Sequence, residues 1–380
     1  MQEVQGRAQH YDWGDADAIP ALLGLEADGR PWAEFWWGTH PSAPSTVAGA
    51  PLVDSTGPLP FLVKLLAAAR PLSLQLHPDA EQAAMGYARE QAAGLALDDP
   101  TRTYRDPWPK PEMVIALTRF EAVCGFASDD VVRHRLEQVG RPGAPLLQRF
   151  VEGGHRAVVT WLLTARPDLG GLAGQVPAIT EPWARWLSVV ARLHPGDPAV
   201  GVLPLLHHVV LEPGGALFLG AGHLHAYLHG VGVEVMGPSD NVVRAGLTSK
   251  YVDTDAVVAL MRGDVLRDPV LLPRREHHGD AEVLRYSVAE APFEVERWAL
   301  DGAAHVTANG DELWWCASGD VGIGRQGSCV LLRQGETALL EGRGSAFRVT
   351  GATRRPSPGR AGAPELRSDD SSPGGPTPRH

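Results

Sequence analysis

The chain has 380 residues, and Asp and Glu outnumber Lys and Arg by 45 to 34, which gives a formal net charge of −11. This length predicts two or three compact units, and the acidic balance argues against nucleic acid or an anionic membrane surface as the main partner. The three cysteines lack metal-binding spacing, the N-terminus lacks an apolar signal core, and no apolar run approaches the roughly 20 residues of a membrane span. We therefore expect a cytoplasmic protein in a reducing compartment.

Short segments typical of β-strands, separated by Gly and Pro, run from residue 1 to about 125. One helix is predicted within them, at Ala80–Ala93. From about 126 to 202 apolar residues recur at helical spacing in two stripes. The stripes consist of Leu146, Leu147, Phe150 and Val151, and of Trp183, Trp186, Leu187 and Val190. A helical segment is therefore expected between two β-rich regions.

Strand patterns return after residue 203. Strands are predicted at His208–Leu211 and Ala216–Leu219, with a turn at Pro213-Gly214-Gly215 between them. A last β-rich block covers about 276 to 350, with a hairpin turn expected at Asn309-Gly310 and a strand signalled by the alternation in Phe293–Glu296. We assign four tryptophans to protein cores. They are Trp36, Trp37, Trp314 and Trp315.

From Arg354 onward the chain is rich in Pro, Gly, Ser and charge, which predicts a disordered tail at 353–380. The complete pattern favours a mainly β fold with a helical insertion. Two separate β-rich blocks indicate a pair of antiparallel sandwiches or jelly rolls.

Gln75 and His77 alternate with Leu74 and Leu76. On a strand this spacing points the amide and the imidazole to one face and both leucines to the other. Because both faces carry groups that need burial or partners, we expect one face to pack on a core and the other to line a polar cavity.

Glu112 closes a Lys-Pro-Glu stretch, and His225 lies in a Leu-His-Ala-Tyr stretch. Together with Gln75 and His77 they supply one amide, two imidazoles and one carboxylate. Such a set can surround a single divalent ion and leave a coordination position for substrate.

Other polar residues could act near this set. His223 and His225 are two apart, which on a strand would put both rings on one side. Glu234 is a candidate acid or base, although a salt-bridged structural role is equally compatible with its spacing. Arg244 and Lys250 lie among small residues and could bind a phosphate or carboxylate.

The order of these motifs resembles type I mannose-6-phosphate isomerase, the zinc-dependent phosphomannose isomerase of the cupin superfamily. The similarity extends from Tyr11 to about Asp253 and weakens in the last β block. It rests on six motifs, which are Ala33–Pro41, Pro60–Lys64, Leu72–Pro78, Lys110–Glu112, Gly220–Tyr227 and Ser239–Lys250.

The resemblance implies cupin-type double-stranded β-helix (jelly-roll) domains. It divides the chain into a catalytic cupin domain at 1–125 with 203–275, a helical domain at 126–202 and a C-terminal cupin-like β domain at 276–352. The implied activity is the reversible isomerisation of D-mannose 6-phosphate to D-fructose 6-phosphate through an enediol, in a monomer with a small phosphosugar substrate. Supply of mannose phosphate for activated mannose is the implied role in carbohydrate metabolism.

The family's residue roles carry over motif by motif. One zinc ion per chain would be held by Gln75, His77, Glu112 and His225. The remaining implied roles are substrate binding and catalysis. Arg244 is implied in both, Lys250 and Ser73 in substrate binding, and Lys110, Glu234 and Tyr227 are candidates for moving the proton.

Three positions depart from the family pattern. Pro109 stands where members often have His, which excludes a proton relay through that side chain. His223 replaces a more usual polar residue and could be an additional metal ligand or a partner of one. Ser249 replaces a common Pro, which affects loop stiffness more than chemistry.

Two other functions fit a cupin with such residues. One is an Fe(II) oxygenase, against which the Gln75 ligand and the cations Arg244 and Lys250 favour a phosphorylated substrate. The other is a non-catalytic phosphosugar-binding cupin, which would not need the acid and base candidates.

Overall fold

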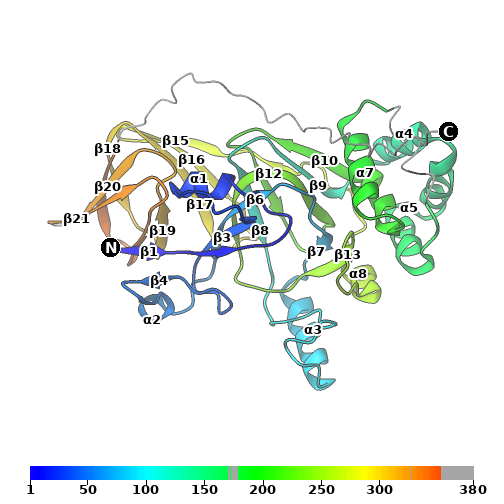
Figure 1. The fold of residues 1–380 in the computed structure, drawn as a ribbon, viewed down its shortest axis with the longest axis horizontal. Helices are drawn as coiled ribbons and strands as arrows, with labels where there is room; N and C mark the ends of the chain where they lie inside the picture. The colour runs from blue at the N-terminus through cyan, green and yellow to red at the C-terminus, as the bar shows by residue number, and fades with distance from the viewer. Residues whose placement is uncertain (170–171, 173–178, 326, 352–380) are drawn as a thin grey trace, which may run out of the picture.

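Strands from distant parts of the chain meet in the centre of the molecule, between a helical block and a C-terminal β block (Figure 1). The structure is a computed structural model and describes residues 1–169, 172, 179–325 and 327–351. The predicted tail at 353–380 lies outside these residues. In the described part the fold is mainly β with helices between the β regions, as the sequence predicted.

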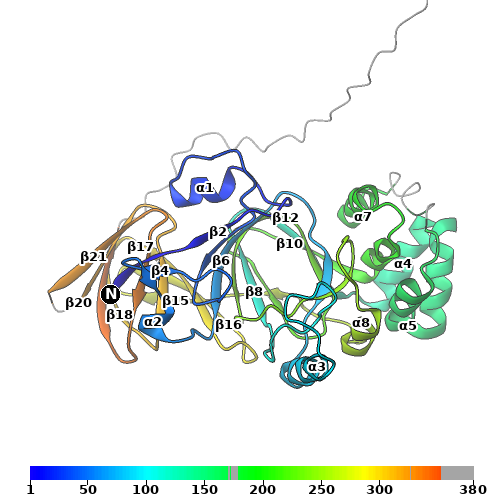
Figure 2. The same ribbon diagram turned by 60° about the horizontal axis from the view of Figure 1, so that its bottom comes forward.

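The central strands form two layers that share one strand (Figure 2). One layer has the order β14-β11-β8-β12-β6-β3-β2, and the other contains β13, β7, β12, β9 and β10. The bounds are β2 Arg7–Gln9, β3 Glu34–Trp37, β6 Leu62–Ala68, β7 Leu74–Leu76, β8 Glu112–Ala116, β9 Phe120–Phe126, β10 Leu206–Leu211, β11 Ala216–Leu219, β12 His225–Met236, β13 Val243–Gly246 and β14 Val270–Leu271.

Strand β12 joins the two layers. Its first half, from His225 to His229, pairs with β7 and β9, and its second half, from Gly230 to Met236, pairs with β6 and β8. At Gly230 the backbone has φ +124°, and a Cβ there would lie 2.7 Å from the carbonyl oxygen of Arg119. Only glycine satisfies both conditions, so Gly230 lets the strand change layers.

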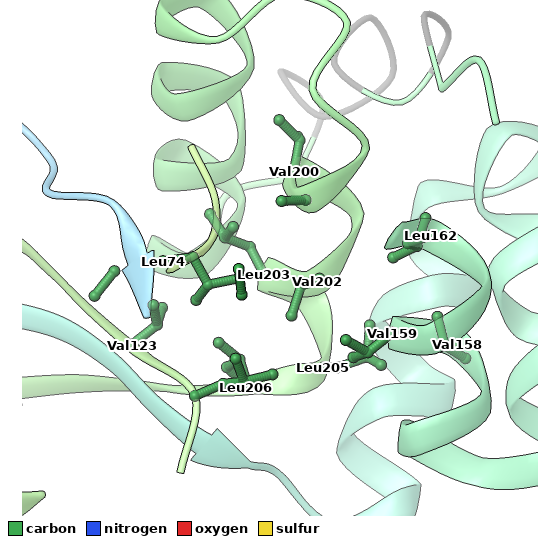
Figure 3. Packing of buried hydrophobic residues seen from close by; sticks show 14 of the residues in the cluster. Leu74, Val123, Val158, Val159, Leu162, Val200, Val202, Leu203, Leu205 and Leu206 are labelled. Atoms are coloured by element: carbon green, nitrogen blue, oxygen red, sulfur yellow. The ribbon is translucent and has the colours of Figure 1, made fainter. Parts of the chain in front are cut away.

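The helical block covers one side of the central layers and shares a core with β7. Its elements are α4 Asp129–Val139, η1 Arg141–Gly143, α5 Ala144–Ala165, α7 Pro182–Leu193 and η3 Pro198–Leu205. Figure 3 shows Leu74 of β7 packed near Leu203 of η3 within this core. The other α-helices among the described residues are α1 Ala18–Leu23, α2 Val53–Thr56, α3 Ala80–Ala92 and α8 Thr254–Leu260.

Most predicted helical features are confirmed. Helix α3 spans Ala80–Ala92 and begins with a capping box between Asp79 and Gln82. The stripe of Trp183, Trp186, Leu187 and Val190 is buried. The inclusion of Val151 in the other apolar stripe is wrong, because this residue is 58% exposed. Five residues after the buried Leu146, it has turned about 140° around the helix and faces solvent.

The C-terminal block contains, among the described residues, three sheets. Their orders are β15-β16-β17, β18-β23-β20-β21 and β19-β22-β1-β4-β5. The bounds are β1 Gln2–Gln5, β4 Thr46–Val47, β5 Ala50–Pro51, β15 Arg274–His278, β16 Ala281–Ser287, β17 Glu294–Leu300, β18 Gly302–Thr307, β19 Glu312–Trp315, β20 Asp320–Arg325, β21 Ser328–Arg333, β22 Thr337–Leu340 and β23 Ala346–Gly351. The first strand of the chain therefore completes a sheet of the last block.

The predicted hairpin at Asn309-Gly310 is wrong. These residues connect β18 to β19, but β18 pairs with β23 and β19 pairs with β22. The Asn-Gly pair therefore turns the chain from one sheet into another, because both strands find their hydrogen-bond partners in later segments. Trp36 and Trp37 are buried, and Trp314 and Trp315 pack partly buried against apolar clusters. Across the described ranges no helix is long and apolar enough to cross a membrane.

We predict that Gly230→Ala lowers the free energy of unfolding by more than about 1 kcal/mol, because the new methyl group meets the Arg119 carbonyl at an unfavourable φ. Urea unfolding followed by circular dichroism would measure the change. Gly310→Ala is the matched control, since a Cβ at Gly310 has open space around it. Equal stabilities of the two variants would contradict the role assigned to Gly230 in the layer change.

Candidate metal centre

Strand pairing gathers three of the predicted residues on one face. Gln75 on β7 lies opposite His225 on β12 in one direction and opposite Arg244 on β13 in the other. Directly paired residues point to the same face of a sheet. Leu74 and Leu76 point the other way and are fully buried in the core shared with the helical block. The prediction of one apolar and one polar face for this strand is confirmed.

His77, Glu112 and His225 bring one donor atom each to within 4.8 Å of one another. Nε2 of His77 lies 3.3 Å from Oε1 of Glu112, and Nε2 of His225 lies 3.7 Å from Oε2 of the same carboxylate. All three side chains are at most 3% exposed. Two imidazole nitrogens and a carboxylate at this spacing suit a divalent metal such as zinc.

Backbone carbonyls orient both imidazole rings. Nδ1–H of His77 donates to the carbonyl oxygen of Asn241 at 2.8 Å, and Nδ1–H of His225 donates to that of His223 at 2.9 Å. Each Nε2 therefore carries a lone pair toward Glu112, and Nε2 of His77 is buried without a hydrogen-bond partner. Burial, and next the neighbouring His77, lower the pKa of His225 to about 4, so this ring is neutral at pH 7.

Gln75 lies at the edge of the same cluster. Its Nε2 is 3.4 Å from Nε2 of His225. The amide oxygen and nitrogen exchange places by a rotation about the last side-chain bond, and the oxygen would then face the imidazole nitrogens as a ligand. The donor set of His77, Glu112 and His225, completed by this oxygen, fits a four-ligand metal site with a neutral amide and neutral imidazoles.

The buried charges around the cluster also fit a cation. Three carboxylates, those of Glu34, Glu112 and Glu234, face two ammonium groups, those of Lys64 and Lys110. Burial opposes ionisation of Glu112, but the nearby His77 and Lys110 hold its pKa well below the usual range. With all five groups ionised, one negative charge remains uncompensated, and a metal cation would neutralise it.

Lys64 and Glu34 are functional candidates that the sequence reasoning did not single out. Nζ of Lys64 lies 3.5 Å from Glu34 and 3.4 Å from Glu234, and 4.7 Å from the ring centre of Trp36. Burial disfavours the Lys64 charge, but Glu34 and Glu234 together raise its pKa. A single lysine inside the apolar run Leu62–Leu66 was the available signal, because a buried charged residue requires partners.

Glu234 and Tyr227 face each other from the two halves of β12. The hydroxyl of Tyr227 donates to Oε1 of Glu234 at 2.8 Å. Burial, and next the charge of Glu112, raise the pKa of Glu234 to about 7. Burial and the charge of Glu234 raise the pKa of Tyr227 well above its usual value. A carboxyl group that titrates near neutral pH can both accept and return a proton.

Cationic side chains gather beside the cluster. Burial and the charge of Arg105 lower the pKa of Arg244, and burial followed by the charges of Arg244 and Arg105 lowers the pKa of Lys250. The three like charges therefore lie close together, which favours an anionic ligand. Ser73 precedes β7, two residues before Gln75, and is half-buried.

His223 is not part of the donor cluster. Strand β12 begins at His225, so His223 lies in the preceding turn and the expected pairing of both rings on one strand face is wrong. Its carbonyl orients His225, and the residue also lines a cavity of about 1430 Å³. That cavity is mostly apolar, and its lining includes Pro78, Pro111 and His223, close in sequence to His77, Glu112 and His225, so it is adjacent to the metal site.

Asn241 is a third residue that the sequence reasoning left without a role. It is fully buried, and its Nδ2 donates to the carbonyl oxygens of Asp106 and Trp108 at 2.8 and 2.9 Å, while its Oδ1 accepts from the Arg105 N–H at 2.8 Å. Residues 105–108 lead directly to Lys110 and Glu112. The Asn241 side chain therefore fixes the segment that carries Glu112, while its own carbonyl orients His77.

Comparisons with known proteins were made for sequence and fold. A sequence model described as "Phosphomannose isomerase type I, catalytic domain" matches residues 1–57 and 52–128. The chain is 32% identical to the mannose-6-phosphate isomerase of Shigella flexneri over 93% of this chain and 98% of the relative. The same values hold for the mannose-6-phosphate isomerase of Escherichia coli K12. The chain is also 31% identical to the mannose-6-phosphate isomerase of Aspergillus fumigatus, over 69% of this chain and 71% of the relative.

Solved structures give the same result. The apo mannose 6-phosphate isomerase of Salmonella typhimurium superimposes with a TM-score of 0.84 at 29% identity, covering 93% of this chain and 97% of the other. A zinc-bound mannose 6-phosphate isomerase superimposes with a TM-score of 0.84 at 29% identity, covering 92% and 97%. The similarity therefore includes the helical block and the C-terminal strands, beyond the part that the family's sequence model matches.

We predict that Asn241→Asp weakens zinc binding roughly 10- to 100-fold, because the new carboxylate cannot donate to Asp106 and Trp108 and displaces the segment next to Glu112. Competition with a chromophoric chelator would measure the zinc affinity. Asn309→Asp makes the same chemical change at an exposed turn and should bind zinc like the parent chain. Equal affinities in both variants would contradict the role assigned to Asn241.

Proposed function

The chain belongs to the type I phosphomannose isomerase family, and we propose on this basis that Gln75, His77, Glu112 and His225 hold its zinc ion. It is an aldose–ketose isomerase that interconverts D-mannose 6-phosphate and D-fructose 6-phosphate, with one zinc ion as cofactor. The observation that carries the site assignment is the convergence of the His77 and His225 Nε2 atoms on the buried Glu112 carboxylate.

Zinc bound at this centre supplies a Lewis acid that polarises the sugar oxygens next to the reacting carbons. The residues around it must then remove the proton from C2 of the open-chain sugar and deliver one to C1. We propose Glu234 as the base, because it is a buried carboxylate whose pKa of about 7 suits transfer in both directions.

Tyr227, Lys64 and Lys110 would assist this transfer. The Tyr227 hydroxyl donates to Glu234 and fixes the direction in which its free lone pairs point. Nζ of Lys64 lies 3.4 Å from the second carboxylate oxygen, so its positive charge stabilises the ionised base. Nζ of Lys110 lies 3.2 Å from Glu112, where it can stabilise negative charge that develops on the substrate oxygens.

We propose Arg244, Lys250 and Ser73 as the groups that bind the substrate phosphate. Arg244 shares a sheet face with the metal ligand Gln75, and Lys250 follows in the next loop. The chain carries a net charge of −11, so a phosphosugar dianion needs a local cationic site. The like charges of Arg105, Arg244 and Lys250 provide one.

The family membership decides against the Fe(II) oxygenase and the non-catalytic binding protein. We further propose that the chain acts as a monomer in the cytoplasm. The division into a catalytic unit at 1–125 with 203–275, a helical unit at 126–202 and a β unit at 276–352 is also a proposal. The apolar cluster of the C-terminal strands supports the β unit, whereas the helical block shares its cluster with strands of the catalytic unit.

Purified protein incubated with mannose 6-phosphate should form fructose 6-phosphate, followed through a coupled assay. Prior treatment with a chelator should abolish the activity, and added zinc should restore it, because the zinc ion supplies the Lewis acid beside the reacting carbons. His77→Ala, which removes one ligand, should stay inactive after zinc is returned. Activity that survives complete metal removal would contradict the assignment of this centre.

We predict that Glu234→Gln lowers kcat roughly 10²- to 10⁴-fold without loss of zinc. In the parent enzyme the base must be ionised, so kcat/KM should fall as the pH drops through the pKa of Glu234. That value is about 7, and the charge of bound zinc would lower it. The acid limb of the pH profile should be missing in the variant. A variant that keeps both its rate and this limb would show that another group is the base.

A further inference from the structure

The loop that carries Lys250 has an unfavourable backbone conformation at its start. Gly246 has φ +131° and Leu247 has φ +55°, a left-handed conformation that leucine rarely adopts. Leu247 is also buried, so the strain is not relieved by exposure to solvent. Such a conformation is unfavourable for a non-glycine residue and persists only where surrounding contacts impose it.

One side chain of the helical block imposes it. Oδ2 of Asp197 accepts a hydrogen bond from the Leu247 N–H at 2.7 Å. The other oxygen, Oδ1, accepts from the Ala199 N–H at 2.9 Å and caps η3. Gly246 packs so closely on Ala199 that a Cβ at residue 246 would overlap its methyl group. The loop therefore packs directly against the first turn of η3.

The contact between this loop and η3 forms one wall of a small polar cavity of about 280 Å³. Asp197, Gly246, Thr248 and Lys250 line it. The Thr248 hydroxyl accepts from the Lys250 N–H at 3.1 Å, which closes a tight turn. On the other side of Gly246, β13 carries Arg244, whose partner in the sheet is Gln75. A shift at residues 246–247 would thus move Lys250 relative to Arg244.

We propose that Asp197 is a positioning residue for phosphate recognition: it holds Leu247 in the left-handed conformation that places Lys250 beside Arg244. The helical block then has a functional role, because it sets the geometry of the substrate loop without contacting the reacting atoms. This inference depends on the proposed function, in which Arg244 and Lys250 bind the phosphate.

A purely structural role of Asp197 is the competing explanation, since the same carboxylate caps η3. Asp197→Ser separates the two roles. Serine at an N-cap still accepts from the Ala199 N–H, but its short side chain has a single oxygen and cannot also reach Leu247. A capping role alone predicts that this variant behaves like the parent enzyme.

The experiment measures KM and kcat for mannose 6-phosphate and the inhibition constant of inorganic phosphate in the zinc-loaded protein. In Asp197→Ser we expect KM and the phosphate inhibition constant to rise together, roughly 10-fold, because misplaced charge-assisted hydrogen bonds weaken anion binding by that order. We expect kcat to change less than about twofold, since the zinc ligands and Glu234 are untouched.

Two further variants test the backbone strain directly. Adding Leu247→Gly to Asp197→Ser should lower KM again, because glycine keeps the left-handed conformation without steric cost. Leu247→Ile in the parent chain keeps the volume but disfavours positive φ, so it should raise KM although Asp197 is intact. Should Asp197→Ser not fold, the Leu247→Ile result alone decides the question.

Asp280→Ser is the matched control, because Asp280 also accepts from a backbone N–H, that of Ala303, but lies in the C-terminal block. Its KM should equal that of the parent enzyme. The proposal is wrong if Asp197→Ser and Leu247→Ile both keep the parent KM, or if kcat falls while KM and phosphate inhibition stay constant. An inactive parent enzyme would instead refute the proposed function.

Discussion

The carboxylate of Glu112 is 2% exposed, and its charge must be compensated inside the protein. Each part of the centre contributes to this. Lys110 provides an ammonium group at 3.2 Å, and His77 and His225 direct Nε2 atoms toward it. When Glu34, Glu112 and Glu234 are all ionised, the compensation within the protein is incomplete, since the buried cluster then holds three carboxylates and two ammonium groups. A bound cation completes it, which couples the electrostatics of folding to the cofactor.

Strand β12 contributes residues to the proposed active site from both layers. Its first half contributes His225 and Tyr227 to one layer, and its second half contributes Glu234 to the other. Because the strand changes layers at Gly230, residues seven apart face each other and the Tyr227 hydroxyl reaches Glu234. The proposed metal ligand and the proposed base therefore lie on one continuous strand, and their relative position depends on the bend between them.

The positions that depart from the family pattern lie outside the donor cluster. His223 orients His225 through its carbonyl, a contact that any residue could make. Pro109 lines the adjacent apolar cavity, and Asn241 holds the neighbouring Trp108 carbonyl. Ser249 is exposed in the loop that begins at the strained Leu247. In this chain the conformation of that loop is set by Asp197 of the helical block, so a proline is not needed to stiffen it.

The sequence by itself determined which residues could form the metal centre and the secondary structure that carries several of them. The alternation around Gln75 and His77 requires a strand with one polar face, and the helix at Ala80–Ala92 begins with its own capping residues. These are local properties, decided by side-chain periodicity and nearby hydrogen bonds. The metal-ligand set could be assembled in advance only because the motifs also resemble a known family.

Tertiary structure decided everything that depends on contacts between distant segments. Three sets of contacts join residues far apart in the chain. They are the ion pair of Lys64 with Glu234, the hydrogen bonds of Asn241 with residues 105–108, and the hydrogen bond between Asp197 and Leu247. The prediction of a hairpin at Asn309-Gly310 is wrong for the same reason, because the strands on either side of it pair with later segments. A local pattern fixes which way a side chain points along its own element, whereas its partner is fixed only when the layers pack.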